Sequence, residues 1–450
     1  MKKNKKTNST TKLALFAGAA ALTAFTSQSH AQSSDALIEK LVDKGILTAN
    51  EAKDLRDEAD KDFKTAFQTK TGMPDWVTGY KISGDFRGRF DGINYDAAKS
   101  PPSRDRFRYR LRFGIVALLQ NDLEAGFRLT SSEPAKGSAS GGDPISGNTT
   151  FTGNGSKKFI YIDQAYGKWS PLHADGWEGN LTVGKMENPF VFSDIVFDQD
   201  YTPEGAAVQL NYALNNTHTL KFNGGGFLLN EISASSYDSY MLGAQVRLDS
   251  MWSPKFQSSF GVAMLDIANG ANLTTGAEPD QNGGNWRNGG GKLLNGFNPF
   301  VVDGSLTYSL DSFFHYNSLF PIRLAGDYIN NPSAHTGGDS GWSAGITFGK
   351  SGKRGLWELS YRYKYLESNA WYEELVDSDT GAFYGAGYHG TGVGYNAGTN
   401  IKGHVFKFVY SFTDSLSLGA TYFLTELIDK PSATISSDTG RLQVDASLKF

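Results

Sequence analysis

The stretch DRFRYRLRFGIVALL, residues 105–119, alternates between charged and apolar side chains. Because successive side chains of a strand point to opposite faces, its arginines share one face and its aromatic and aliphatic residues share the other. The arginine face carries Arg106, Arg108, Arg110 and Arg112. Four arginines in a row need water or counter-charge, since burial of an unpaired charge is too costly. A wall that is wet on one face and apolar on the other is what a water-filled transmembrane β-barrel requires.

Two other structures are compatible with this single strand. A soluble antiparallel sheet alternates in the same way when its apolar face covers a core. A basic sheet face can also bind nucleic acid. The remainder of the chain separates these possibilities.

The composition of the chain suits many turns and many aromatic-rich strands. The 450 residues include 52 Gly, 30 Phe and 21 Tyr but only 14 Pro. There is no cysteine, which excludes a disulfide framework, a thiolate metal site and a cysteine nucleophile. The length allows one large barrel or about two or three ordinary domains.

Residues 1–31 are expected to be a secretory signal peptide. Five lysines near the start precede an apolar run, Leu13 to Phe25, that is too short to span a bilayer, and small residues allow cleavage after Ala31. The alternative is an N-terminal membrane anchor. Cleavage removes five lysines and no acid, so the formal net charge changes from −4 to −9, which argues against nucleic-acid binding. No later segment approaches about 18 consecutive apolar residues, so no membrane-spanning helix is expected.

Residues 32–76 are expected to form a periplasmic helical hairpin and linker. A short apolar stripe surrounds Leu41, and Thr48 with Glu51 matches a capping box that begins a second, charged helix. The segment has too little apolar surface to fold alone. It is therefore either an element that self-associates or docks, or a solvated spacer.

From Tyr80 onward the pattern has a period of two residues, so residues 77–450 are expected to form an all-β, transmembrane antiparallel barrel. We predict about sixteen strands, within a range of roughly 14–18, and an even number is usual in bacterial barrels. The expected spans are 79–93, 105–119, 123–133, 158–170, 179–188, 204–213, 217–229, 236–249, 255–268, 298–310, 320–331, 339–349, 355–369, 400–413, 416–428 and 440–450.

The connections between these strands alternate in length. Short turns follow several strands, and long polar loops lie at 134–157, 269–297 and 370–399. Outer-membrane barrels have this asymmetry, with short turns facing the periplasm. Charged side chains on the polar strand faces are expected to line the channel. Besides the four arginines above, they are Arg87, Arg89, Arg128, Arg362 and Lys364.

The chain ends in RLQVDASLKF, in which Leu448 and Phe450 share the apolar face. A last strand that alternates and stops on a terminal Phe resembles the signal by which outer-membrane proteins are recognised for barrel assembly. We therefore expect these two residues to be read by the barrel-assembly machinery. The alternative is an ordinary edge strand.

Residues 181–210 read LTVGKMENPFVFSDIVFDQDYTPEGAAVQL and resemble the putative-porin family of Gram-negative outer membranes. The resemblance rests on the GKMENPF run at 184–190 and on the PEG run at 203–205. The hairpin at 35–67 and the GDFRGRF run at 84–90 are also similar to that family. The resemblance implies a β-barrel channel, a homotrimer and passive uptake of small hydrophilic solutes or ions.

The segment at about 189–204 joins the fifth and sixth predicted strands, where porins in general carry the loop that folds inward and narrows the channel. Its acids would then face the arginines of the wall and set a transverse field that selects solutes by charge. These acids are Asp194, Asp198, Asp200 and Glu204. In the alternative, they lie at the channel mouth and only solvate the loop.

Signals for catalysis and for metal binding are weak. Ser343 lies in a GWSAG sequence, but its flanks read as a strand, whereas a nucleophile elbow needs a strand followed by a helix. The histidines are scattered without metal-ligand spacing. We therefore expect no catalysis, no cofactor and no metal site.

The sequence thus predicts a diffusion channel in the Gram-negative outer membrane. Its expected partners are small hydrophilic solutes or ions and outer-membrane lipid, and nucleic acid is excluded. Two alternatives stay open. One is a barrel enzyme of lipase or protease type, and the other is a closed structural or adhesin barrel with a filled lumen.

Overall fold

The structure is a computed structural model that describes residues 74–95, 103–135, 141–233, 235–274, 283–381, 398–430 and 436–450. The predicted signal peptide at 1–31 and the predicted helical hairpin at 35–67 lie outside the described residues. The chain divides into two compact units, Met1–Asp75 and Trp76–Phe450, and the strands described below belong to the second. Among the described residues, no helix is both long and apolar enough to cross a membrane.

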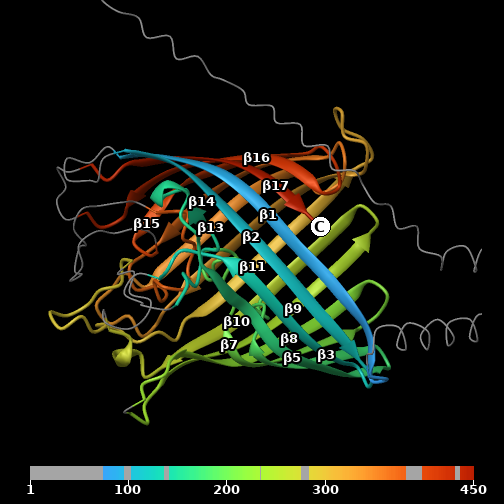
Figure 1. Ribbon diagram of the computed structural model, residues 1–450, viewed down its shortest axis with the longest axis horizontal. Coiled ribbons are helices and arrows are strands. Elements are labelled where there is room, and N and C mark those ends of the chain that lie inside the picture. The colour runs from blue at the N-terminus through green and yellow to red at the C-terminus, as the bar shows by residue number, and fades with distance from the viewer. Residues whose placement is uncertain are drawn as a thin grey trace, which may run out of the picture. The chain divides into compact units, whose positions relative to one another are not determined.

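The second unit is a closed antiparallel barrel (Figure 1). Of the seventeen strands in the described residues, sixteen are long and one, β4, has two residues. The strands are β1 (Val77–Tyr95), β2 (Arg104–Leu119), β3 (Leu123–Ser131), β4 (Thr149–Thr150), β5 (Ile160–Ala174), β6 (Trp177–Lys185), β7 (Glu204–Ala213), β8 (His218–Asn230), β9 (Ser239–Ser253), β10 (Phe256–Ala268), β11 (Phe300–Leu310), β12 (Phe320–Asn330), β13 (Ser340–Gly349), β14 (Trp357–Leu366), β15 (Ile401–Ser411), β16 (Leu416–Leu427) and β17 (Thr439–Lys449). β1 pairs with both β2 and β17, which closes the wall.

The predicted barrel of about sixteen strands is confirmed, because each expected span overlaps one long strand. These strands can be predicted from the sequence because charged or polar side chains alternate with apolar ones along most of their length. The two residues of β4 were not predicted. They pair with Arg108 and Tyr109 of β2 and attach the connection between β3 and β5 to the wall.

Short connections gather at one end of the barrel and long ones at the other (Figure 1). The short turns include 120–122, 175–176 and 254–255. The long connections include 132–159, 186–203, 269–299 and 367–400. The sequence predicts this asymmetry, and in outer-membrane barrels the long loops face the exterior.

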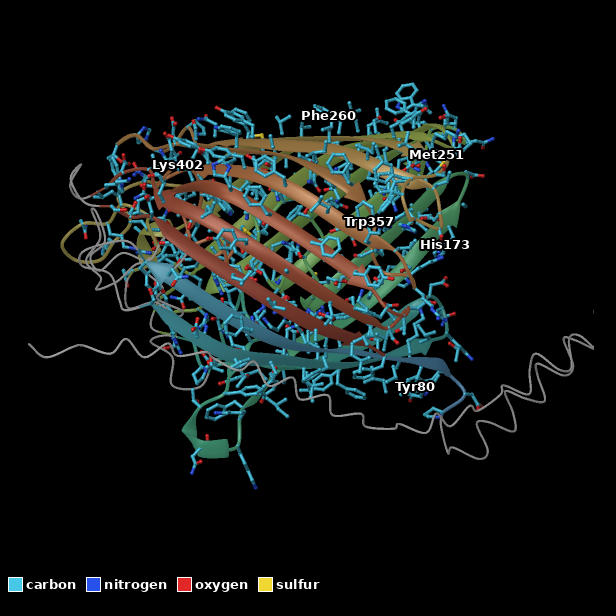
Figure 2. All side chains as sticks on the ribbon, turned by 90° about the horizontal axis from the view of Figure 1, so that it is seen from above. Tyr80, His173, Met251, Phe260, Trp357 and Lys402 are labelled. Atoms are coloured by element: carbon cyan, nitrogen blue, oxygen red, sulfur yellow. The ribbon has the colours of Figure 1, made fainter. Side chains whose placement is uncertain are left out.

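The outer face of the wall is apolar. On β2, Phe107 and Phe113 are 59% and 45% exposed, whereas Arg108, on the opposite face, is 7% exposed. Figure 2 shows side chains standing on the outer surface, with Tyr80 and Phe260 among those labelled. Such a face matches the lipid-facing band of an outer-membrane barrel.

One part of the barrel interior is also apolar, which the sequence analysis did not predict. Inward side chains of the strands between β7 and β12, among them Phe227, Met241 and Leu265, are almost fully buried. They pack against apolar residues of three long connections, 186–203, 269–299 and 367–400. The loop residues follow no period, so the pattern of the chain gives no sign that these loops fold inward.

Trp371 joins these loops to one another. Its side chain is fully buried, and its ring meets Phe197 and Phe297 edge-on, with centroids 6.1 and 6.2 Å apart. Edge-to-face aromatic contacts of this kind add to the stabilisation from burial. The interior is therefore divided into an apolar part that fixes the loops and a polar part that faces the arginines of β1 and β2.

We predict that Gly205→Ala destabilises the barrel by about 1–3 kcal/mol, because a Cβ there would lie 2.1 Å from the carbonyl oxygen of Gly226 on β8. The matched control is Gly167→Ala on β5, where no atom lies within 4 Å and the expected change is below about 0.5 kcal/mol. The temperature at which the folded band disappears in electrophoresis reports both. Equal unfolding temperatures for the two variants would contradict the close contact.

Candidate functional site

Three adjacent strands, β17, β1 and β2, carry a cluster of seven arginines on their inner faces. The arginine cluster consists of Arg87, Arg89, Arg106, Arg108, Arg110, Arg112 and Arg441. The strand register sets Arg87 directly opposite Arg110, and Arg89 directly opposite Arg108. Like charges opposite each other destabilise a sheet, so the cluster requires carboxylates.

Aspartates on the same three strands supply part of this counter-charge. The pairs are Asp85 with Arg110 and Arg112, Asp91 with Arg106 and Arg441, and Asp445 with Arg89, at nitrogen–oxygen distances of 2.6–2.9 Å. Asp91 is completely buried. A buried carboxylate between two guanidinium groups is tolerated because both charges are paired.

The loop at 186–203, here called loop A, adds two further carboxylates. Asp200 accepts hydrogen bonds from Arg110 at 2.7 Å and from Arg112 at 3.3 Å. Loop A also reaches β14, where Asp194 lies 2.8 Å from Arg362 and 2.6 Å from Lys364. Loop A is therefore held inside the barrel by ion pairs to two separate parts of the wall.

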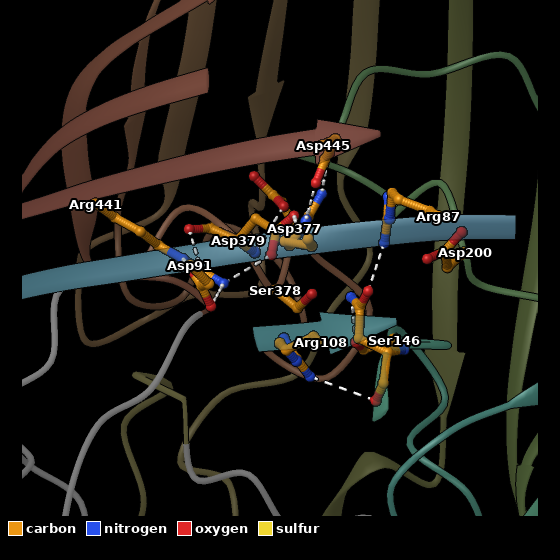
Figure 3. Close-up of polar contacts among 12 residues, drawn as sticks. Arg87, Asp91, Arg108, Ser146, Asp200, Asp377, Ser378, Asp379, Arg441 and Asp445 are labelled. Atoms are coloured by element: carbon orange, nitrogen blue, oxygen red, sulfur yellow. Dashed lines mark hydrogen bonds and ion pairs between the residues drawn. The ribbon is translucent and has the colours of Figure 1, made fainter. Parts of the chain in front are cut away.

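A second inward segment, residues 367–381 or loop B, was not predicted to contribute to the site. Its Asp379 lies 3.0 Å from Arg89 and 3.1 Å from Arg441, and Figure 3 shows it beside Asp91. Its Asp377 lies 2.7 Å from Lys364. These two acids sit in a long connection with no strand pattern around them, and alternation alone could not place them.

Loops A and B are also bonded to each other. The N–H of Asp198 donates to the carbonyl of Leu375 at 2.8 Å, and the N–H of Asp377 donates to the carbonyl of Asp194 at 3.1 Å. The N–H of Ser378 donates to the Asp198 carboxylate at 2.9 Å. The two loops therefore form one inward-folded body.

Several predicted residues have partners that differ from the expectation. We expected the acids of loop A to face all of the arginines from Arg106 to Arg128. Only Arg110 and Arg112 of that set bond to loop A, because Arg106 pairs with Asp91. Arg128 pairs instead with Asp163 of β5. Arg106 and Arg128 therefore take their counter-charge from carboxylates on the strands and not from loop A.

The predictions for Glu204 and Asp198 were wrong in their partners. Glu204 is the first residue of β7 and lies directly opposite Lys185 of β6, to which it bonds at 3.1 Å. Glu204 does line a cavity of about 490 Å³ together with Arg110 and Arg112, but its carboxylate pairs with Lys185 rather than with an arginine. Asp198 has no cationic partner within the described residues, and its carboxylate accepts backbone N–H groups instead.

The two residues of the expected assembly signal lie at the closing seam of the barrel. Leu448 is 39% exposed on the outer face. The main chain of Phe450 exchanges two hydrogen bonds with Gly84 of β1, at 2.8 and 3.1 Å. The last residue therefore takes part in the pairing that joins the first and last strands.

Opposing effects set the pKa values of the carboxyl groups that pair with the wall. Burial would raise the pKa of Asp194, but Lys364 and Arg362 hold it below its ordinary value. Burial acts in the same way on Asp379, whose pKa Arg89 and other arginines hold well below the ordinary value. Both groups are therefore charged over the neutral range.

Asp198 behaves in the opposite way. Burial raises its pKa first, and the neighbouring carboxylates of Asp377 and Asp200 raise it further, to well above the ordinary value. Two backbone N–H groups favour its charged form without reversing this outcome. The junction between loops A and B therefore contains one carboxyl group that holds its proton more tightly than usual.

A cavity of about 580 Å³ lies between the arginine cluster and the two loops. Its walls include Arg87, Arg110, Asp200, Asp379 and Lys407, together with the aromatic ring of Phe192. Guanidinium groups line one side and loop carboxylates the other. Such a space can accept small polar solutes and act on their charge.

The GWSAG sequence lies within strand β13, as its flanks indicated. The Ser343 hydroxyl accepts a hydrogen bond from Nε of Arg362 at 2.8 Å and bonds to Asp327, and β13 continues through the motif to Gly349. Within the part of the chain that the structure describes, no three His, Asp or Glu side chains are grouped to hold a metal ion.

Residues 97–278 match the sequence profile of a family described as putative porin. The matched span contains β2 to β10 and therefore includes loop A and four of the seven arginines in the cluster. The resemblance that the sequence motifs indicated is confirmed over this span. A search of curated proteins finds no match.

The fold is similar to that of solved outer-membrane porins. OprB of Pseudomonas putida, in a structure at high pH, is 10% identical with a TM-score of 0.50, and the match covers 83% of this chain and 94% of that chain. OmpF of Salmonella typhi, in a complex with daunomycin, is 11% identical with a TM-score of 0.46, and the match covers 82% of this chain and 97% of that chain. At such identity the likeness to OprB concerns the fold.

Because the pKa of Asp198 is raised, the docked state of loop A binds a proton that the released state does not bind. We predict that docking of loop A on loop B is tightest in acid. Docking should weaken as the pH rises above the ordinary carboxyl range of about 4. Open-channel current noise between about pH 4 and pH 8 should therefore rise with pH.

The variant Asp198→Asn should remove this pH dependence of the noise. The control Asp311→Asn, at an exposed turn, should keep it. If the current noise of Asp198→Asn rises with pH as steeply as that of the wild type, Asp198 is not the group that controls docking of loop A.

We predict that Trp371→Ala loosens both loops by about 3–5 kcal/mol, the range for truncation of a buried aromatic residue. The control is Trp342→Ala on β13, whose ring is 41% exposed on the outer face. Limited proteolysis of the folded barrel should cut within 186–203 much faster in Trp371→Ala than in the control. Equal cleavage rates would show that Trp371 does not hold loop A.

Proposed function

We propose that this chain, an outer-membrane porin by its match to the putative-porin family and by its fold, is a passive diffusion channel narrowed by loops A and B. Small hydrophilic solutes or ions would cross through the polar part of the lumen. The observation that carries the proposal is the anchoring of loop A, whose Asp200 is bonded to β2 and whose Asp194 is bonded to β14. A loop fixed at two separate parts of the wall lies across the interior.

The charges at this crossing favour selection by charge and by polarity. On one side lie the arginines that face the cavity, among them Arg87 and Arg110, and on the other lie carboxylates of the loops, among them Asp200 and Asp379. Facing rows of opposite charge set a field across the passage, so dipolar and charged solutes are oriented as they cross. A solute that carries groups of both signs fits such a field best.

We propose that the chain catalyses no reaction. Ser343, the residue of the enzyme alternative, is 2% exposed within a strand, and Arg362 and Asp327 occupy its hydroxyl. A nucleophile needs an exposed position on a sharp turn beside a base. The apolar packing inside the barrel favours the other alternative, a closed structural barrel. A measurement of single-channel conductance distinguishes a closed barrel from an open channel.

The assembly of the protein is also part of the proposal. The apolar outer face is suited to outer-membrane lipid, and a homotrimer is the state that the family resemblance implies. Leu448 and Phe450, at the closing seam, would be read by the barrel-assembly machinery. Deletion of Phe450, or replacement of Leu448 by a polar residue, should lower the amount of folded barrel in the outer membrane.

We predict that deletion of 191–202 increases the single-channel conductance in a planar bilayer, because it removes Asp194, Asp200 and the part of loop A between them. The double substitution D194N/D200N, which only releases the two ends, should change the conductance in the same direction. Deletion of 153–156, an exposed segment of the connection between β3 and β5, is the control and should have no effect. If both loop A variants have the conductance of the wild type, loop A does not narrow the channel.

A further inference from the structure

The charges of the arginine cluster do not balance. Five of its seven arginines make ion pairs with five carboxylates, namely Asp85, Asp91, Asp200, Asp379 and Asp445. Two positive charges are therefore left over. They belong to Arg87 and Arg108, because no carboxylate among the described residues lies within ion-pair distance of either one.

Both of these arginines turn instead toward Asn148, a buried residue of the connection between β3 and β5. Arg87 donates through Nη2 to the side-chain oxygen of Asn148 at 2.8 Å. Arg108 donates through Nη2 to the carbonyl oxygen of Asn148 at 3.4 Å. Figure 3 shows dashed lines from Arg87 and from Arg108 to the segment that carries Ser146.

Each of the two guanidinium groups has a donor left without a partner. The Nε atoms of Arg87 and Arg108 are buried and make no hydrogen bond in the structure. Arg108 is 7% exposed, so water has little access to it. Buried polar groups in native proteins are nearly always hydrogen-bonded, and an unpaired charged donor is among the most costly exceptions.

Asn148 is held in place independently of the arginines. Its side-chain amide donates to the hydroxyl of Ser146 at 3.1 Å, and the next two residues form β4, which pairs with β2. Glu133 and Asp143 act on Arg108 from beyond ion-pair distance, and Glu133 accepts the N–H of Thr150 instead. Within the described residues, the surrounding chain therefore gives neither guanidinium group a direct ion pair.

A solute in the lumen can reach this place. Arg87 and Asn148 both line the cavity of about 580 Å³ that lies between the wall and the two loops. A guanidinium group is a planar fork of donors that fits two oxygens of a carboxylate, phosphate or sulfate. An oxyanion at this point would pair with the guanidinium group of Arg87, and Arg108, which does not line the cavity, would add its positive charge from the wall.

We propose that Arg87, supported by Arg108 and Asn148, is a binding subsite for an oxyanion inside the channel. The ligand class is a solute that carries a phosphate, sulfate or carboxylate group. The proposal rests on the proposed channel function, since it names a class of solute for the same lumen. The subsite concentrates such solutes at the narrow part of the passage.

Single-channel current in potassium chloride, with inorganic phosphate, sulfate or acetate added, tests this proposal. We expect a saturable decrease of the chloride current with the oxyanion. Arg87→Gln should weaken the block about tenfold, the effect of losing one charge-assisted hydrogen-bonding group. Arg87→Lys should restore part of it, because the charge remains but the fork is lost. Arg323→Gln is the control, since it removes the same charge from β12 beside a different cavity.

Calorimetric titration of phosphate into the detergent-folded barrel separates the subsite from the channel function. Binding heat that disappears in Arg87→Gln supports the subsite even if the protein conducts no current, in which case only the channel function fails. If the protein conducts current that no oxyanion blocks, and if none of the three oxyanions gives binding heat, the subsite is overturned and the channel function stands.

The pattern of block identifies the ligand class. Block by acetate as well as phosphate assigns carboxylated solutes to the site, and block by phosphate or sulfate alone restricts it to the tetrahedral oxyanions. A block that is equal in Arg87→Gln and the wild type overturns the role of Arg87.

Discussion

Arginines that face the interior of the barrel need counter-charge or a ligand, and this requirement organises the polar half of the structure. Because Arg87 lies opposite Arg110 and Arg89 opposite Arg108, the wall repels itself until carboxylates are added. Aspartates on the same strands neutralise part of the charge. The remainder draws Asp200 of loop A and Asp379 of loop B into the barrel. The narrowing of the lumen is thus a consequence of charge on the wall.

Loops A and B are held by two kinds of force that act on opposite sides. On one side, aspartates bond to the arginine cluster and to Lys364 of β14. On the other side, Phe197 and Trp371 pack in the apolar part of the interior. Ion pairs near water contribute little and depend on salt and pH, whereas apolar burial does not depend on the protonation of these carboxyl groups. The apolar contacts therefore hold the body of the two loops, and the ion pairs set how closely the edge of loop A is held to the wall.

The sequence was sufficient for the wall of the barrel and for the faces of its strands. Strict alternation, as in β2, sets which residues face lipid and which face the lumen, because a shift by one residue would reverse every side chain. The partner of Glu204 follows from the pairing of the strands, because Glu204 lies directly opposite Lys185. As a loop residue, Glu204 would be expected to face the arginines, but it is the first residue of β7 and pairs with Lys185.

The loops could not be predicted in the same way. Phe197 and Trp371 are separated by more than a hundred residues and share no period, so their contact depends on the closed barrel that brings the two loops together. The partners of Asp377 and Asp379 depend on how loop B turns inward, which no local pattern encodes. A surplus of arginine over acid on the strands was visible in the sequence. It indicated that counter-charge must come from elsewhere, but it did not indicate which loop supplies it.

The most direct test of this account is the single-channel conductance of the unmodified protein in a planar bilayer, measured with neutral polymers of graded size. The account predicts stepwise currents that only small polymers reduce, because loops A and B exclude the larger ones from the lumen. Two results would contradict it. One is the absence of conductance from a folded, heat-modifiable barrel. The other is a polymer limit as wide as an empty barrel of sixteen strands allows.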